Sequence, residues 1–205
     1  MAELNWAEVR RYLGLDGMIP ELEGKLRQAG EWLLAAASPK AVWNVVPGIQ
    51  TESQDLQTHL EGCNSCFLFA ATLGIEVDRL MTRLSVTDSS AAVMIQACAA
   101  AFLEAFCDEQ MELLAKEVPG QFLRPRFSPG YGDFPVEYNS KILSALNADK
   151  IIGLSTTTAN MLVPTKSITA VIGYSNTPDS RFPGCASALG CSSCSKTDCA
   201  FRREG

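Results

Sequence analysis

The residues with the clearest chemical potential lie in the segment from Leu123 to Asp133, which reads L-R-P-R-F-S-P-G-Y-G-D. Its two prolines fix their own φ angles and keep the residues before them out of the helical region. Gly130 permits a turn that residues with a Cβ rarely adopt. We therefore expect a stiff loop that presents the guanidinium of Arg124 and the amphipathic ring of Tyr131. Such a loop is either a binding element or a connector between two subdomains.

A second chemical feature is a cluster of four cysteines near the end of the sequence. They are Cys185, Cys191, Cys194 and Cys199, and hardly any apolar side chain stands between them. Tetrahedral thiolate coordination explains this density, and either Zn²⁺ or an iron–sulfur cluster fits. The alternative is a loosely ordered, thiol-rich tail. The spacing of the four cysteines matches no single standard pattern, so it does not distinguish a Zn²⁺ site from an iron–sulfur cluster.

Three other groups could carry chemistry. Cys63 and Cys66 form a C-x-x-C pair, which can be a redox or metal element, but without a second pair nearby we interpret it as structural. His59 is the only histidine, and we expect it to be a capping or surface residue. Glu104 is the first carboxylate after a long apolar run. A carboxylate so close to a buried face needs either a neighbouring cation or a ligand.

Composition excludes several classes of function. The 205 residues are 47% hydrophobic and 20% charged, which predicts a globular protein with one domain of ordinary size. The net charge of −6 argues against a nucleic-acid partner, because phosphate binding needs clustered Lys and Arg. We see no secretory signal, and no apolar stretch of the roughly 20 residues that a membrane span needs. The prediction is a cytoplasmic protein without a membrane partner, where eight cysteines are thiols or metal ligands.

The part of the chain before the loop is predicted to be mostly helical. Pro20 suits the first turn of a helix, and Asp88 suits an N-cap. Gly74 is interpreted as a C-terminal cap. The last helix is apolar on most faces in its first half, which predicts burial. The expected elements are helices at 3–13 and 20–37, a strand at 42–46, two helices within 56–84 and a helix at 88–118.

After the loop, the pattern changes to one short helix and several strands. We expect the helix at 135–146 and strands at 150–154, 161–163 and 167–174, with 164–166 as the turn of a hairpin. Local strands after a helical front predict an α+β fold with an antiparallel sheet.

The segment R-F-S-P-G-Y-G-D resembles the R-P-x-P-G-Y motif of the activation, or reactivation, domain of cobalamin-dependent methionine synthase, in the form of its stand-alone relatives. A second block, residues 155–181, is similar to the family pattern t-x-S-x-M-x-P-x-x-S-v-s-G followed by S-H-P-D-S. A third, softer block comprises residues 71–79 and the helix through 103–106. These blocks follow the family order over residues 55–182. Read from Arg124, the loop is two residues longer than the family motif.

The resemblance implies a helical N-terminal part packed on a bent antiparallel sheet over residues 1–183, followed by a short Cys-rich tail at 184–205. It also implies binding of S-adenosylmethionine (AdoMet) and reductive methylation of cob(II)alamin, the cobalamin being held by a partner protein. That partner is a methionine synthase or another corrinoid methyltransferase, with a flavodoxin or a ferredoxin-type electron donor. The chain would then be a component of a methyl-transferring enzyme, in which the cofactor supplies the reactive groups and the protein orients them.

Carried over by motif, Arg124 holds the methionyl carboxylate, and Tyr131, the catalytic candidate, lies between AdoMet and the corrin. Backbone groups near 126–128 contact adenine or the methionyl amine. Phe182 stands where longer family members have tyrosine. The cofactor-binding set implied in this way is Glu104, Arg124, Arg126, Ser128, Gly130, Tyr131 and Phe182.

Alternatives remain open for both residues and function. Arg124 could be a surface arginine stacked on Tyr131. The whole protein could be an electron-transfer protein that reduces a corrinoid through an iron–sulfur cluster on the tail cysteines. It could also be a pure AdoMet-binding module.

Overall fold

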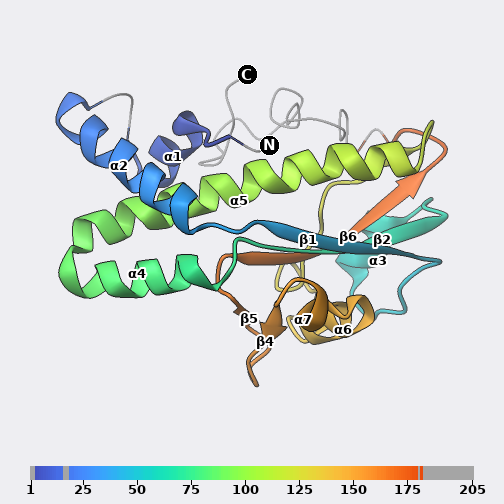
Figure 1. The fold of residues 1–205 in the computed structure, drawn as a ribbon. Coiled ribbons are helices and arrows are strands. Elements are labelled where there is room, and N and C mark those ends of the chain that lie inside the picture. The colour runs from blue at the N-terminus through green and yellow to red at the C-terminus, as the bar shows by residue number, and fades with distance from the viewer. Residues whose placement is uncertain (1–2, 16–18, 180, 182–205) are drawn as a thin grey trace.

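The computed structural model describes residues 3–15, 19–179 and 181. The fold is α+β, as predicted, with an antiparallel sheet of strand order β1-β2-β6-β3 (Figure 1). The long helix α5 (Ser89–Glu117) covers one face of the sheet, and α6 (Tyr138–Leu146) with α7 (Ala148–Ile151) packs on the other. The sheet strands are β1 (Lys40–Val46), β2 (Ser65–Thr72), β3 (Phe122–Leu123) and β6 (Ser167–Ser175).

The N-terminal helices form a separate helical head. Helices α1 (Trp6–Tyr12), α2 (Pro20–Ala36) and α4 (Ile75–Thr87) pack around the first half of α5, at the end of the molecule away from β3 (Figure 1). Pro20 occupies the first turn of α2 and Asp88 caps α5, accepting a hydrogen bond of 3.0 Å from the Ala91 amide, both as predicted. Helix α5 therefore joins the head to the sheet.

The two faces of the sheet have different apolar cores. On the α5 side, Phe67 and Phe69 of β2 pack with Leu114 of α5. On the other side, Leu68 of β2 packs with Ile142 of α6. Alternate residues of a strand point to opposite faces, so both faces of β2 are buried.

The prediction of two helices within 56–84 was wrong at β2. Only α3 (Gln54–Leu60) and α4 are helical there, and β2 lies between them. A short, continuous apolar run has no periodicity that separates a buried strand from a buried helix. Gly74 was also misassigned, because it precedes α4 as its N-cap residue, with φ of 90°.

Two assignments after the loop were wrong as well. Residues 148–151 form the single turn α7, and the chain does not continue as a strand to 154. The predicted hairpin around 164–166 is absent from the described ladders, because β5 (Leu162–Val163) pairs with β4 (Ser155–Thr156) instead of β6. The strand β6 finds its partner in β2, about a hundred residues earlier, which local sequence does not reveal.

Helix α5 contradicts the expectation that no apolar stretch is long enough to span a membrane. By length and composition it could cross a membrane, and it is the single described helix that meets this test. Within its apolar 18-residue window, 56% is buried inside the protein. The division at residues 183/184 stays a prediction, because the tail lies outside the described residues.

Candidate functional site

The loop from Leu123 to Asp133 is held along its first half by β6. The Arg124 amide donates to the Gly173 carbonyl at 2.7 Å, and Phe127 and Val171 exchange two backbone hydrogen bonds of 3.0 and 2.8 Å. The loop thus continues β3 along the outer edge of the sheet. Pro125, which has no N–H, lies between these contacts and leaves no donor unpaired.

Between the two points at which the loop pairs with β6, the loop has one residue more than β6 has. Leu123 faces Tyr174 and Phe127 faces Val171, so four steps on the loop match three on β6. This is the arrangement of a β-bulge, which reverses the alternation of side chains between faces. Leu123 accordingly packs in the α5-side core and Phe127 in the α6-side core.

The second half of the loop is anchored to α3. The carboxylate of Asp133 accepts hydrogen bonds from the Ser53 hydroxyl and from the amides of Gln54 (2.7 Å) and Asp55 (3.1 Å). The Ser53 hydrogen bond, followed by those from the two amides, lowers the pKa of Asp133. Gly130 has φ of 92°, the conformation that was expected for a glycine in this turn.

On one side of the loop, Arg124 is sealed in the protein. It is 4% exposed, and its guanidinium contacts the Asp179 carboxylate at 2.8 Å and the Glu61 carbonyl at 3.2 Å. Asp179 also contacts Arg181 at 2.6 Å. The idea of a surface arginine stacked on Tyr131 is therefore wrong. In this conformation the guanidinium is engaged by protein groups.

His59 belongs to the same sealed side and is not a surface or capping residue. It is 6% exposed, its Nε2 lies 3.0 Å from the Pro125 carbonyl, and its ring stacks on Phe127 with centroids 5.0 Å apart. Burial, and then the charges of Arg124 and Arg181, lower its pKa below 6.5, although the hydrogen bond to Pro125 acts in the opposite direction. Burial thus favours the neutral ring, and its Nε2–H donates to the Pro125 carbonyl.

On the other side of the loop lies an open groove of about 460 Å³ between α5, α6 and the free edge of β6. Its volume falls in the range of small-molecule sites. The groove is lined by Leu103, Glu104, Arg126, Phe127, Ser128, Pro129, Tyr131, Asn139, Leu162, Ser167, Ile168 and Thr169.

Arg126 is the cation of this groove. It contacts Glu104 at 2.7 Å and Asp108 at 2.9 Å. Burial disfavours its charge, but attraction by its acidic neighbours outweighs burial and raises the pKa of Arg126. Burial raises the pKa of the adjacent Cys107 to about 12, so that thiol is neutral near pH 7 and the two carboxylates provide the attraction. Glu104 thus has a neighbouring cation, which faces the same groove.

The opposite wall of the groove is neutral and polar. Thr169 donates a buried hydrogen bond of 2.6 Å to the Asn139 side-chain oxygen, and the Asn139 amide donates to the Asn160 carbonyl at 2.9 Å. Among the described residues, the outer edge of β6 from Ser167 to Ala170 has no strand partner. Backbone donors and acceptors of that edge are therefore available to a ligand.

The structure brings together four of the residues singled out from sequence. Glu104, Arg126, Ser128 and Tyr131 line the groove. Arg124 does not, and Gly130 shapes the turn between Ser128 and Tyr131. Phe182 and the four tail cysteines, Cys185, Cys191, Cys194 and Cys199, lie outside the described residues. Within the described ranges, no group of three or more potential ligands could hold a metal ion.

Sequence analysis missed Asp108, Asn139 and Thr169. Asp108 follows Glu104 by four positions, so both carboxylates lie on one face of α5, and this spacing could have identified it. No local signal marks the other two. Cys66 is buried in β2, where burial raises its thiol pKa to about 12, and Cys63 is half-buried; both are free thiols.

Comparison with known proteins finds a likeness in structure. The fold is similar to a crystal structure described as the MetH reactivation domain bound to AdoHcy, with a TM-score of 0.64. The alignment covers 86% of this chain and 75% of that chain at 18% sequence identity. No protein-family model matches the chain, and no curated protein matches it by sequence. At this identity the likeness shows a shared fold, which agrees with the family suggested by the loop motif.

Proposed function

We propose that the groove binds AdoMet and that the chain is a reactivation partner of a corrinoid methyltransferase, most simply a cobalamin-dependent methionine synthase. The observation that carries the proposal is the placement of Arg126, Glu104 and Tyr131 around one open groove on this fold. The structural neighbour is described with AdoHcy, the demethylated product of AdoMet, which supports the ligand class.

The arginine for the methionyl carboxylate is Arg126 in this proposal and not Arg124. In the motif R-P-x-P-G-Y the arginine precedes the tyrosine by five positions, and counting back from Tyr131 gives 131 − 5 = 126. This alignment needs no insertion. Arg126 lines the groove, whereas Arg124 is engaged by Asp179. A guanidinium pairs with a carboxylate through two parallel hydrogen bonds, which fix its orientation.

Charge complementarity supports AdoMet over a neutral ligand. Arg126 with Glu104 and Asp108 has a formal sum of +1 − 2 = −1. AdoMet carries a sulfonium, an ammonium and a carboxylate, and is therefore a net cation. Its carboxylate would displace one acidic neighbour from Arg126, and the released carboxylate would face the ammonium or sulfonium. The free edge of β6 offers backbone groups to adenine, in the manner of a peptide strand.

The partner is inferred from Tyr131. Its side chain is on a loop braced at both ends, yet the residue is 69% exposed. A rigid, exposed aromatic at the rim of a ligand groove is suited to burial against a second protein. In our proposal that surface is the corrin, and Tyr131 positions the sulfonium methyl group against cobalt.

The test of ligand binding is calorimetry with AdoMet on the purified chain and on Arg126→Gln. Losing a charge-assisted pair predicts a weakening of about tenfold or more. Arg27→Gln, which makes the same change at an exposed position of α2, is the matched control and should bind as the unaltered chain does. Equal affinity of Arg126→Gln and Arg27→Gln would refute the assignment of the carboxylate site.

The test of the partner is recovery of turnover. The chain, AdoMet and a reduced flavodoxin are added to a methionine synthase that lacks its own reactivation domain and has been trapped as cob(II)alamin. Recovery should be lost in Tyr131→Ala while AdoMet affinity changes little. AdoMet binding without any recovery would leave a pure AdoMet-binding module and would reject the reactivation role.

A further inference from the structure

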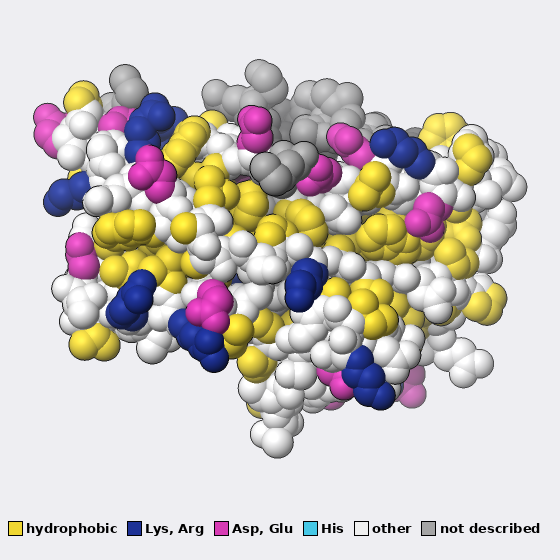
Figure 2. All heavy atoms as spheres, in the orientation of Figure 1, with side chains coloured by type: hydrophobic (Ala, Val, Ile, Leu, Met, Phe, Trp, Pro, Cys, Tyr) yellow, Lys and Arg dark blue, Asp and Glu magenta, His cyan; other side chains and the backbone are white. Residues whose placement is uncertain are grey.

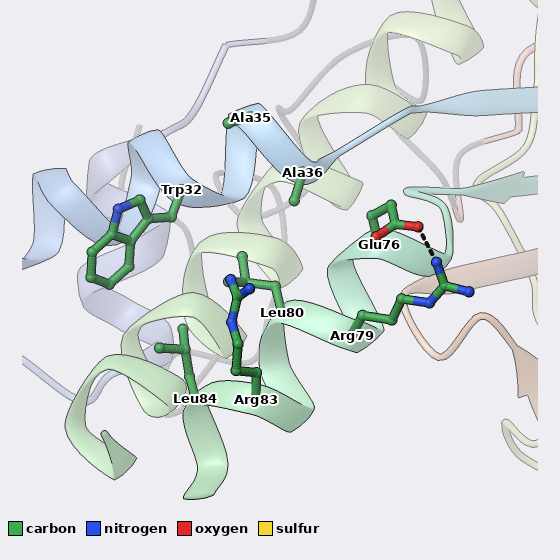
Figure 3. A pocket seen from close by; sticks show the side chains of 8 residues that line it. All are labelled: Trp32, Ala35, Ala36, Glu76, Arg79, Leu80, Arg83 and Leu84. Atoms are coloured by element: carbon green, nitrogen blue, oxygen red, sulfur yellow. Dashed lines mark hydrogen bonds and ion pairs between the residues drawn. The ribbon is translucent and has the colours of Figure 1, made fainter. Parts of the chain in front are cut away.

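A second pocket lies in the helical head, between α2 and α4. Its volume is about 450 Å³, and it is formed by one turn of α2 and two turns of α4 (Figure 3). The residues that line it come from both helices. They are Trp32, Ala35, Ala36, Glu76, Arg79, Leu80, Arg83 and Leu84.

The pocket has an apolar floor and one aromatic wall. Leu80 and Leu84 are nearly buried, at 7% and 8% exposed, whereas Trp32 is 40% exposed. Ala35 and Ala36 are small, which leaves the space that a larger side chain of α2 would fill. In Figure 2, hydrophobic side chains gather between α2 and α4, with Lys or Arg side chains beside them. An exposed indole next to an apolar floor suits a flat, apolar ligand.

The rim of the pocket is cationic, although the chain as a whole carries −6. Arg79 forms an ion pair with Glu76 at one end. Arg83 reaches from α4 towards α2 on the part of the pocket that Trp32 lines (Figure 3). It forms no ion pair within the described part of the chain. An arginine beside an indole binds planar anions well, because guanidinium stacks on aromatic rings and hydrogen-bonds carboxylates.

We propose that this pocket binds a small planar or aromatic molecule that bears one carboxylate. Its ring would lie on Trp32 above Leu80 and Leu84, and its carboxylate would pair with Arg83. The pocket volume of about 450 Å³ falls in the range of small-molecule sites. The site is distinct from the AdoMet groove and does not depend on it.

The experiment uses 2-naphthoate as the probe and the indole N–H signals of the three tryptophans in a nitrogen-15 NMR spectrum as the readout. Trp32→Phe assigns the signal of Trp32. The expected result is a saturable shift of that signal and no saturable shift of Trp6 or Trp43. The neutral analogue 2-naphthalenemethanol should bind about fivefold to tenfold more weakly, because it lacks the charge that Arg83 pairs with.

Variants separate the parts of the proposal. Arg83→Gln should weaken 2-naphthoate about fivefold to tenfold and leave 2-naphthalenemethanol unchanged. Ala35→Leu fills the pocket from an exposed position of the helix and should abolish binding of both probes. Lys25→Gln, on α2 but outside the pocket, makes the same charge change as Arg83→Gln and should have no effect. The proposal is overturned if 2-naphthoate does not saturate by about 1 mM, or if Ala35→Leu binds it normally.

Discussion

The two sides of the loop present two arginines in opposite situations. Arg124 is 4% exposed, and its guanidinium contacts the Asp179 carboxylate and the Glu61 carbonyl. Arg126, two positions later, lines an open groove; its side chain is 15% exposed, and the carboxylates that it contacts are 33% and 50% exposed. One residue type in one loop therefore serves two purposes. On the sealed side it is paired within the protein, and on the open side we propose that it exchanges its partner for a ligand.

The difference lies in the surroundings of each ion pair. A buried pair loses hydration when it forms, so removing one partner leaves an uncompensated charge. A pair near water exchanges partners at low cost. A variant of Arg124 should therefore lose more stability than a variant of Arg126. The Arg126 variant should instead lose more affinity for AdoMet.

The largest effect should come from Arg124→Met. It leaves the Asp179 carboxylate, 12% exposed, with Arg181 as its remaining cation, and should lower the free energy of unfolding by about 3 kcal/mol, the low end of the cost of breaking a buried pair. Urea unfolding measures this. In the double variant with Asp179→Leu, part of the loss should be recovered, since an apolar pair can replace a buried ion pair. A loss below about 1 kcal/mol in Arg124→Met would mean that the ion pair between Arg124 and Asp179 is hydrated like a surface pair.

The next largest effect should come from Gly173→Ala in β6. The added Cβ would lie 2.7 Å from the Cys63 sulfur and 2.8 Å from the Leu60 side chain, on the side of Arg124. Overpacking of this kind costs about 1–3 kcal/mol. Gly24→Ala on α2, where no atom lies within 4 Å, is the control and should not destabilise the protein. Equal stabilities of these two variants would contradict close packing behind β6.

His59 predicts a pH dependence on the sealed side. Its pKa is lower in the folded chain than its ordinary value of 6.5, so the unfolded chain binds more protons below that pH. Its contribution is complete above pH 6.5 and is lost as the pH falls, with a slope of at most about 1.4 kcal/mol per pH unit. Urea unfolding at pH 7.5 and 5.5 should show a smaller decrease in His59→Gln. Parallel decreases in the two proteins would rule out a buried neutral ring.

The smallest effect on stability should come from Arg126→Gln. Because Glu104 and Asp108 are partly exposed and can be hydrated, the free energy of unfolding should fall by less than about 1 kcal/mol. The same variant should show the large loss of AdoMet affinity described above. If Arg126→Gln unfolded as readily as Arg124→Met, the distinction between the sides would fail.

Much of the framework was predictable because its signals are local. Pro20 and Asp88 mark helix starts by their own chemistry, and the apolar first half of α5 indicates burial. The strand β2 was missed because burial on both faces erases periodicity. The candidate site depends on pairing between distant segments, so the sequence pointed to the loop but could not show which arginine faces the groove. The partner of Arg124, Asp179, is 55 positions away.

The extra residue between Leu123 and Phe127 has an electrostatic consequence. In a regular strand, positions 124 and 126 would project from the same face, and two guanidinium groups would repel each other a few ångströms apart in a poorly hydrated space. The insertion places the thickness of the sheet between them. Arg124 is then paired with Asp179 and Arg126 with Glu104 and Asp108, and removing a residue here would bring these two guanidinium groups to the same face.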